Sequence, residues 1–183
     1  MKVLFLDAYN LIYRARSGFT KGDYAVIYNF FRGIRPLVEK FNPDKVYFVL
    51  EGNPKFRAQL SDGNYKANRK SAGDLFHRQK ASIINMVSAM MPFYVVKHPD
   101  LECDDTIATL VYKHHNEGDE SVIISSDSDF IQLLGNMNVK LYNPIRKVFI
   151  ETPEYDYVTW KALRGDATDN IPGIPGCGDK TAT

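Results

Sequence analysis

The chain has 183 residues, of which 44% are hydrophobic, and a formal net charge of +1. Length and composition are those of a globular protein with one buried core. No apolar run approaches the roughly 20 residues that cross a bilayer, and Cys103 and Cys177 are too few for a disulfide framework or a zinc site. We therefore expect a cytoplasmic protein with no membrane association, whose basic surfaces, if any, are local.

Short apolar runs rich in β-branched residues alternate with stretches of helical periodicity along the chain. The expected strands are 2–6, 45–50, 93–96, 121–125 and 139–142, with a hairpin partner at 147–150. The expected helices are 8–16, 23–40 with Asp23 as N-cap, 75–90, 104–116, 129–134 and 155–163. This alternation predicts an α/β fold of three layers, in which helices cover both faces of a mostly parallel central sheet.

Acidic residues follow several of these strands. Asp7 ends the first strand, Glu51 follows the second, and Asp127 follows the strand at 121–125. Parallel sheets bind ligands outside the carboxyl ends of their strands, and clustered carboxylates repel one another unless cations neutralise them. Oxygen ligands without paired His or Cys favour Mg²⁺ or Mn²⁺. The full predicted metal set is Asp7, Glu51, Glu102, Asp104, Asp105, Asp127, Asp129, Asp166 and Asp169.

Each of these acids also has an ordinary structural explanation. Residues 102–105 open a helix, where carboxylates cap free N–H groups and complement the helix dipole. Residues 127–129 fit a strand-end turn, and residues 166–169 fit a loop turn. Because so many independent caps would rarely meet at one sheet edge, the joint pattern favours a metal-dependent phosphodiester hydrolase.

A basic segment lies between residues 55 and 80, with seven Lys or Arg residues and only two Asp. Phe56 stands between Lys55 and Arg57, and Tyr65 stands beside Lys66. Cations interleaved with aromatic rings suit a surface that follows a nucleic-acid backbone. A solvated loop is the alternative, because Ser, Gly, Asn and Lys dominate the stretch.

Five motifs, in order, resemble those of the 5′ nuclease superfamily. That superfamily includes the 5′→3′ exonuclease domain of bacterial DNA polymerase I, flap endonucleases, and phage 5′ exonucleases and ribonucleases H. The motifs are Leu6-Asp7-Ala8-Tyr9-Asn10, Phe56-Arg57 with Tyr65-Lys66-Ala67-Asn68-Arg69, Glu102-Cys103-Asp104-Asp105, Ser125-Ser126-Asp127-Ser128-Asp129-Phe130, and residues 165–176. They extend across the whole chain, which looks most similar to the short phage enzymes.

The resemblance implies a 5′→3′ exonuclease or flap endonuclease that uses two Mg²⁺ ions, with Mn²⁺ as a substitute. It implies catalytic roles for Lys66, Arg69, Asp104 and Asp127. It implies substrate contacts from Arg14, Tyr65, Lys66, Arg69, Gly173, Gly176 and Gly178. The expected partner is DNA with 5′ ends or flaps, or an RNA–DNA hybrid, bound by a monomer. Residues 1–163 would form the nuclease core and hold every strand, and residues 164–183 would begin a helix–hairpin–helix-like module.

Two features depart from the family pattern. Glu51 stands where the family usually has Asp, and the chain stops soon after the glycine-rich turn, where further residues normally follow. We therefore expect an incomplete hairpin module. Two alternatives stay open: a nucleic-acid-binding module with little activity, and a ribonuclease with a PIN-like fold. Exonuclease action, flap cleavage and RNA-primer removal are not separated by the sequence.

Overall fold

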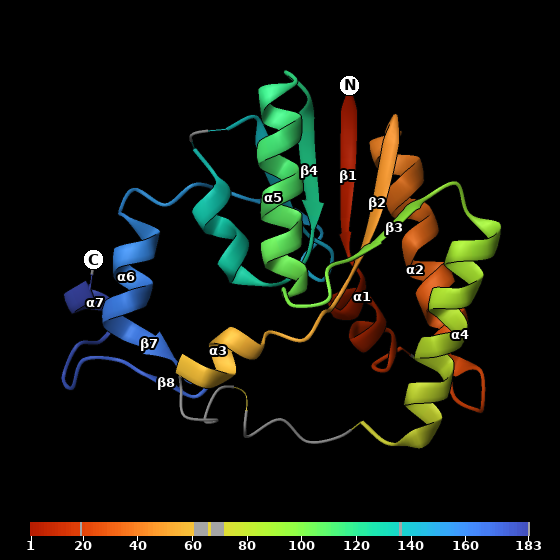
Figure 1. Ribbon diagram of the computed structural model, residues 1–183, viewed down its shortest axis with the longest axis horizontal. Coiled ribbons are helices and arrows are strands. Elements are labelled where there is room, and N and C mark those ends of the chain that lie inside the picture. Colours follow the sequence, from red (N-terminus) through yellow and green to blue (C-terminus); the bar gives the residue numbers. More distant parts are fainter. Residues whose placement is uncertain (19, 61–65, 67–71, 136, 183) are drawn as a thin grey trace.

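A six-stranded sheet forms the centre of the computed structural model, which describes residues 1–18, 20–60, 66, 72–135 and 137–182 (Figure 1). The strands are β1 (Lys2–Asp7), β2 (Lys45–Leu50), β3 (Tyr94–Lys97), β4 (Glu120–Ile124), β5 (Val139–Asn143) and β6 (Val148–Ile150). They lie in the order β3-β2-β1-β4-β5-β6, and β6 alone pairs antiparallel within this sheet. The predicted α/β class with a mostly parallel sheet is confirmed.

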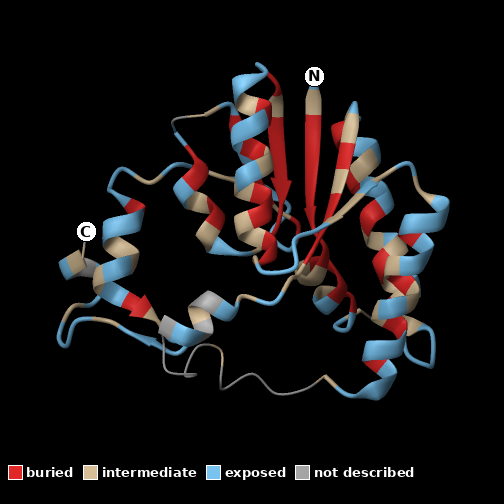
Figure 2. Cartoon of the chain, viewed as in Figure 1, coloured by how far each residue is buried: buried red, intermediate tan, exposed pale blue. Residues whose placement is uncertain are grey.

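Helices cover both faces of this sheet. They are α1 (Ala8–Ala15), α2 (Ala25–Phe41), α3 (Lys55–Leu60), α4 (Asp74–Met90), α5 (Cys103–Asn116), the 3₁₀ helix η1 (Ser128–Leu133), α6 (Tyr157–Arg164) and α7 (Asp179–Ala182). Side chains alternate along a strand, so Leu4 and Leu6 pack with α1, α2 and α4, whereas Val3 and Phe5 pack with α5 and η1. Two buried layers therefore enclose the central strands (Figure 2).

The order in which the chain adds strands to the sheet reverses at β1. From β1 it moves to β2 and β3 on one side, and then returns past β1 to β4 on the other side. Asp7 pairs with Val49 of β2, and Leu6 pairs with Ile124 of β4. The carboxyl ends of three neighbouring strands thus meet at a topological switch point, where open α/β sheets bind ligands.

The start of α2 differs from the sequence prediction. The helix begins at Ala25 with Tyr24 as N-cap and no side-chain cap from its own segment, so the assignment of Asp23 as the cap was wrong. The side-chain oxygen of Gln79, buried on α4, accepts hydrogen bonds from the N–H groups of Val26 at 2.9 Å and Ile27 at 3.4 Å. A neighbouring helix supplies the cap, which local sequence does not show.

Two short strands beyond residue 163 correct the expectation that residues 1–163 hold every strand. They are β7 (Gly165–Asp166) and β8 (Ile171–Pro172), which pair antiparallel. The turn depends on glycine: Gly165 has φ of 75°, and a Cβ on Gly173 would lie 2.1 Å from the carbonyl oxygen of Arg164. The residues that follow α6, here called the tail (residues 165–182), are therefore folded back against α6. Nowhere in the described parts is a helix long and apolar enough to span a membrane.

Candidate active site

Asp7 lies at the centre of the carboxyl edge. Its Oδ1 accepts a hydrogen bond from the N–H of Asn10 at 3.1 Å, which caps α1, and its Oδ2 accepts one from the Ser125 hydroxyl at 2.8 Å. Only 8% of Asp7 is exposed, and this burial raises the pKa of the carboxyl group to about 6, with a smaller contribution from the charge of Asp127. A cation beside Asp7 would offset the cost of its buried charge.

The N-terminus of α5 carries three acids, one as the N-cap and two in the first turn. Glu102 is the N-cap, and its N–H donates to Oδ2 of Asp105 at 3.2 Å, so the capping explanation holds for Asp105. Ligand oxygens of Glu102, Asp104 and Asp105 nevertheless lie within 4.8 Å of one another, close enough to share one cation. Burial, and then the charge of Glu102, raises the pKa of Asp104 to about 7.

Glu51 connects β2 to the same helix. Its Oε2 accepts a hydrogen bond from the N–H of Cys103 at 3.0 Å, so the longer side chain reaches the first turn of α5. The backbone beside it is equally close: Gly52 N–H donates to the carbonyl oxygen of Leu101 at 3.0 Å, and a Cβ on Gly52 would lie 2.2 Å from that oxygen. Glycine at this position lets the end of β2 approach the loop that delivers Glu102.

The end of β4 contributes Asp127 and Asp129. Asp127 N–H donates to the Ser125 hydroxyl at 3.0 Å, and Oδ1 of Asp127 accepts from Asp129 N–H at 3.0 Å. Burial raises the pKa of Asp127, assisted by the negative charge of Asp129. The side chains of Asn10 and Ser126 are hydrogen bonded at 2.9 Å, so β4 and α1 are held in a fixed relation around Asp7.

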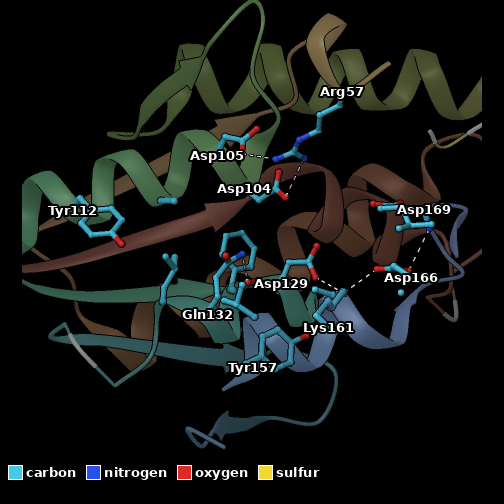
Figure 3. Close-up of a pocket in the computed structure, with 17 residues that line it drawn as sticks. Arg57, Asp104, Asp105, Tyr112, Asp129, Gln132, Tyr157, Lys161, Asp166 and Asp169 are labelled. Atoms are coloured by element: carbon cyan, nitrogen blue, oxygen red, sulfur yellow. Dashed lines mark hydrogen bonds and ion pairs between the residues drawn. The ribbon is translucent and has the colours of Figure 1, made fainter. Parts of the chain in front are cut away.

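Lys161 of α6 connects the tail to the core. Its Nζ forms an ion pair with Asp166 at 2.8 Å and another with Asp129 (Figure 3). Burial opposes the charge of Lys161, but the hydrogen bonds to both carboxylates outweigh it and raise its pKa. Sequence reasoning missed this residue, because a lysine near a helix C-terminus is ordinarily assigned to the helix dipole.

Lys66 reaches the acids from the basic segment. Its Nζ forms an ion pair with Glu102 and lies 3.9 Å from Oε1 of Glu51. Its backbone N–H donates to the carbonyl oxygen of Asp169 at 3.3 Å, and its φ of 57° is in the left-handed region that non-glycine residues rarely adopt. Lys66 therefore joins the basic segment, the tail and α5 at one point.

The other predicted substrate contacts are less central or lie outside the described residues. Tyr65 and Arg69 are outside them. Arg14 is half-buried, which lowers its pKa, and it does not line the open cleft into which Asp7 and Asp127 face. Gly176, with φ of 80°, is exposed, and the carbonyl oxygen of Gly178 accepts hydrogen bonds from the N–H groups of Thr181 and Ala182 in α7. Their proposed phosphate contacts stay predictions.

An open cleft of about 680 Å³ lies over these groups. Its acidic lining is Asp7, Glu51, Asp104, Asp127, Asp129, Asp166 and Asp169. Tyr9 and Tyr13 of α1 form an aromatic wall of the cleft, to which the sequence patterns gave no role. A second cavity of about 630 Å³ adjoins it between α5, η1 and α6, and Asp105 lines this second one (Figure 3). Seven of the nine predicted acids thus share one cleft, and Glu102 and Asp105 lie beside it.

The residues of this cleft fit hard divalent cations. The acidic donors are carboxylate oxygens, and burial raises the pKa of Asp7 and Asp104 because their charges are poorly solvated. Cys103 does not compete as a ligand: burial raises the pKa of its thiol, and its Sγ donates to the carbonyl oxygen of Val49 at 3.2 Å. Oxygen-only donors of this kind suit Mg²⁺ or Mn²⁺ better than Zn²⁺ or copper.

The strand order and the acidic cleft at the switch point define a class: a doubly wound α/β domain with a candidate metal-dependent active site. Residues 2–162 match the family model described as the 5′–3′ exonuclease, N-terminal resolvase-like domain. The chain belongs to that family.

Curated relatives include DNA polymerase I of Thermus thermophilus, 32% identical over 198 residues, which cover 99% of this chain and 23% of the relative. DNA polymerase I of Mycobacterium tuberculosis is 32% identical over 209 residues, covering 98% of this chain and 22% of the relative. The chain thus spans about a quarter of the length of these polymerases. Their shared segment is the nuclease-family domain and not the whole enzyme.

Solved structures share the fold. The D15 protein of bacteriophage T5, co-crystallised with metal ions, superposes with a TM-score of 0.83 at 21% identity, over 100% of this chain and 73% of that one. The catalytic core of Rad2 in complex with DNA gives a TM-score of 0.65 at 17% identity, over 99% of this chain and 58% of that one. At these identities the likeness establishes the architecture alone.

Proposed function

We propose that this chain is a divalent-metal-dependent 5′ nuclease that hydrolyses phosphodiester bonds near the 5′ ends of DNA. The observation that carries the proposal is the convergence of seven acids from β1, β2, α5, β4 and the tail on one cleft, in a chain of the 5′–3′ exonuclease family. A protein that only bound nucleic acid would gain nothing from carboxylates that face the phosphates of the bound strand, because like charges repel.

Two Mg²⁺ ions, or Mn²⁺ in their place, are the proposed cofactors, and they would activate a water molecule and stabilise the leaving oxygen. Asp7, Glu102, Asp104 and Asp127 would hold one end of the metal site. Asp129, Asp166 and Asp169 would hold the other end, around Lys161. Glu51 and Asp105 are better placed to fix α5, since Glu51 accepts from the N–H of Cys103 and Asp105 accepts from that of Glu102.

Basic and aromatic side chains of the site would bind and orient the substrate. Lys66 lies against Glu102 at the edge of the cleft, where its ammonium group can stabilise charge on the scissile phosphate. Tyr9 and Tyr13 line the cleft, and aromatic side chains in such a position can stack on a base that is not paired. We include 5′ flaps, nicked duplex and RNA–DNA hybrids among the candidate substrates and a monomer as the acting species.

A cleavage assay with end-labelled substrates tests this function. We expect 5′-flap, nicked-duplex or hybrid substrates to be cut in Mg²⁺ or Mn²⁺ and to stay intact in EDTA. In Ca²⁺ they should be bound without cleavage, because Ca²⁺ accepts looser coordination geometry. Asp127→Asn should lose several orders of magnitude of rate and remain folded. Full activity in excess EDTA, or in the Asp127→Asn variant, would refute the metal-dependent mechanism.

A further inference from the structure

Arg57 makes a set of contacts that the sequence did not predict for a residue of the basic segment. Its guanidinium group forms an ion pair with Glu102. It also forms one with Asp105, at 2.5 Å, and lies 3.9 Å from Oδ2 of Asp104 (Figure 3). These are the three acids whose ligand oxygens lie within 4.8 Å of one another. Arg57 therefore offsets part of the negative charge of the group of carboxylates that a single divalent cation could span.

Glu102 shows how this contact bears on metal binding. Its side chain is 2% exposed, its Oε1 pairs with Lys66 and its Oε2 pairs with Arg57. Each oxygen thus already accepts a charged donor, and a divalent cation approaching it would meet the positive charges of both side chains at short range. Binding of a metal ion at Glu102 requires at least one of these donors to move.

Arg57 is the more exposed of the two donors, since the Lys66 side chain is 20% exposed. The Arg57 side chain is 34% exposed, and it stands on α3, a helix of six residues at the start of the basic segment. A guanidinium group binds a phosphate through two parallel hydrogen bonds, as it binds a carboxylate. Released from α5, Arg57 would be available to the backbone of a nucleic acid that enters the cleft.

We propose that Arg57 is a positioning residue that exchanges partners. In the metal-free chain it holds Glu102, Asp104 and Asp105; when a divalent cation binds at Glu102 and Asp104, it leaves these carboxylates and contacts a substrate phosphate. Metal loading and capture of the backbone are then linked through one side chain. The second half of this inference rests on the proposed nuclease function, whereas the competition between Arg57 and the metal does not.

The test compares Arg57→Gln with Arg35→Gln, a matched control that removes one charge from an exposed pair with Glu39 on α2. Calorimetric titration of the chain with Mg²⁺ and with Ca²⁺, without nucleic acid, should give at least threefold tighter binding for Arg57→Gln and no change for the control. Unchanged or weaker metal binding by folded Arg57→Gln would overturn the competition.

Arg57→Lys keeps the charge but cannot span three carboxylates, so its metal affinity should fall between those of wild type and Arg57→Gln. If the glutamine variant does not fold, metal affinity of Arg57→Lys equal to that of wild type would overturn the competition instead.

A second measurement tests the exchange. Fluorescence anisotropy with a 5′-flap DNA should show Arg57→Gln binding at least threefold more weakly than wild type in Ca²⁺, with little difference in EDTA, where Arg57 is held by the carboxylates. An equal loss in both conditions would show that Arg57 contacts DNA without exchanging partners. A wild-type chain that binds no divalent cation and cleaves no substrate would refute the proposed function. Cleavage by wild type, together with equal metal affinity in wild type and Arg57→Gln, would refute only this inference.

Discussion

Asp7→Asn tests whether the cleft stores electrostatic strain in the absence of metal. The pKa of Asp7 is raised from 3.8 to about 6, chiefly by burial. A group with a raised pKa binds its proton more tightly in the folded state. The contribution of Asp7 to the free energy of unfolding therefore falls as the pH rises from about 4 to about 6, and then stays level. The shift corresponds to about 3 kcal/mol at neutral pH, taken as an upper limit.

Asparagine removes this charge but keeps one acceptor oxygen and the shape of the side chain. The Ser125 and Asn10 hydrogen bonds are partly lost, at a cost of about 1 kcal/mol. In EDTA at pH 7.5 we therefore expect Asp7→Asn to be about 1–2 kcal/mol more stable than wild type. At pH 4, where wild-type Asp7 is largely protonated, the variant should be equally stable or slightly less stable.

Urea denaturation at the two pH values measures this difference, with exposed Asp23→Asn as the control. The control should follow wild type at both values, because its carboxyl group lies in water. Adding Mg²⁺ at pH 7.5 should stabilise wild type more than Asp7→Asn, since the ion offsets the buried charge. A variant that is less stable than wild type by the same amount at both pH values would refute the electrostatic explanation and assign Asp7 a purely structural role.

Two further substitutions probe how the acids and cations are positioned. Gly52→Ala should lower the unfolding free energy by about 1–3 kcal/mol and reduce the cleavage rate, because the new Cβ would meet two carbonyl oxygens at 2.1 and 2.2 Å. The control Gly33→Ala, whose Cβ meets nothing within 4 Å, should stabilise α2. Equal denaturation midpoints for the two variants would contradict the predicted clash at Gly52. Lys66→Ala should lower single-turnover cleavage at least tenfold with little change in DNA affinity, whereas exposed Lys113→Ala should change neither; an effect on affinity alone would remove Lys66 from the catalytic set.

The sequence by itself determined the sheet and most of the acidic edge. β-branched runs separated by helical periodicity predicted the central strands, because β1, β2 and β4 are buried over most of their length and are therefore mainly apolar. The same pattern predicted that Asp7, Glu51 and Asp127 would meet, since parallel strands bring their carboxyl ends to one edge. These predictions needed only local periodicity and chain direction.

Tertiary structure alone decided which groups neutralise that edge and what holds the flanking helices. Gln79 caps α2 from another helix, Lys161 joins Asp129 to Asp166, and Arg57 turns from the basic segment onto α5. Most of these partners are far apart in sequence, and they are selected by which buried charges and N–H groups remain to be satisfied once the core has packed. A charged side chain in an unfolded chain has many possible partners, and packing reduces them to the few within its reach.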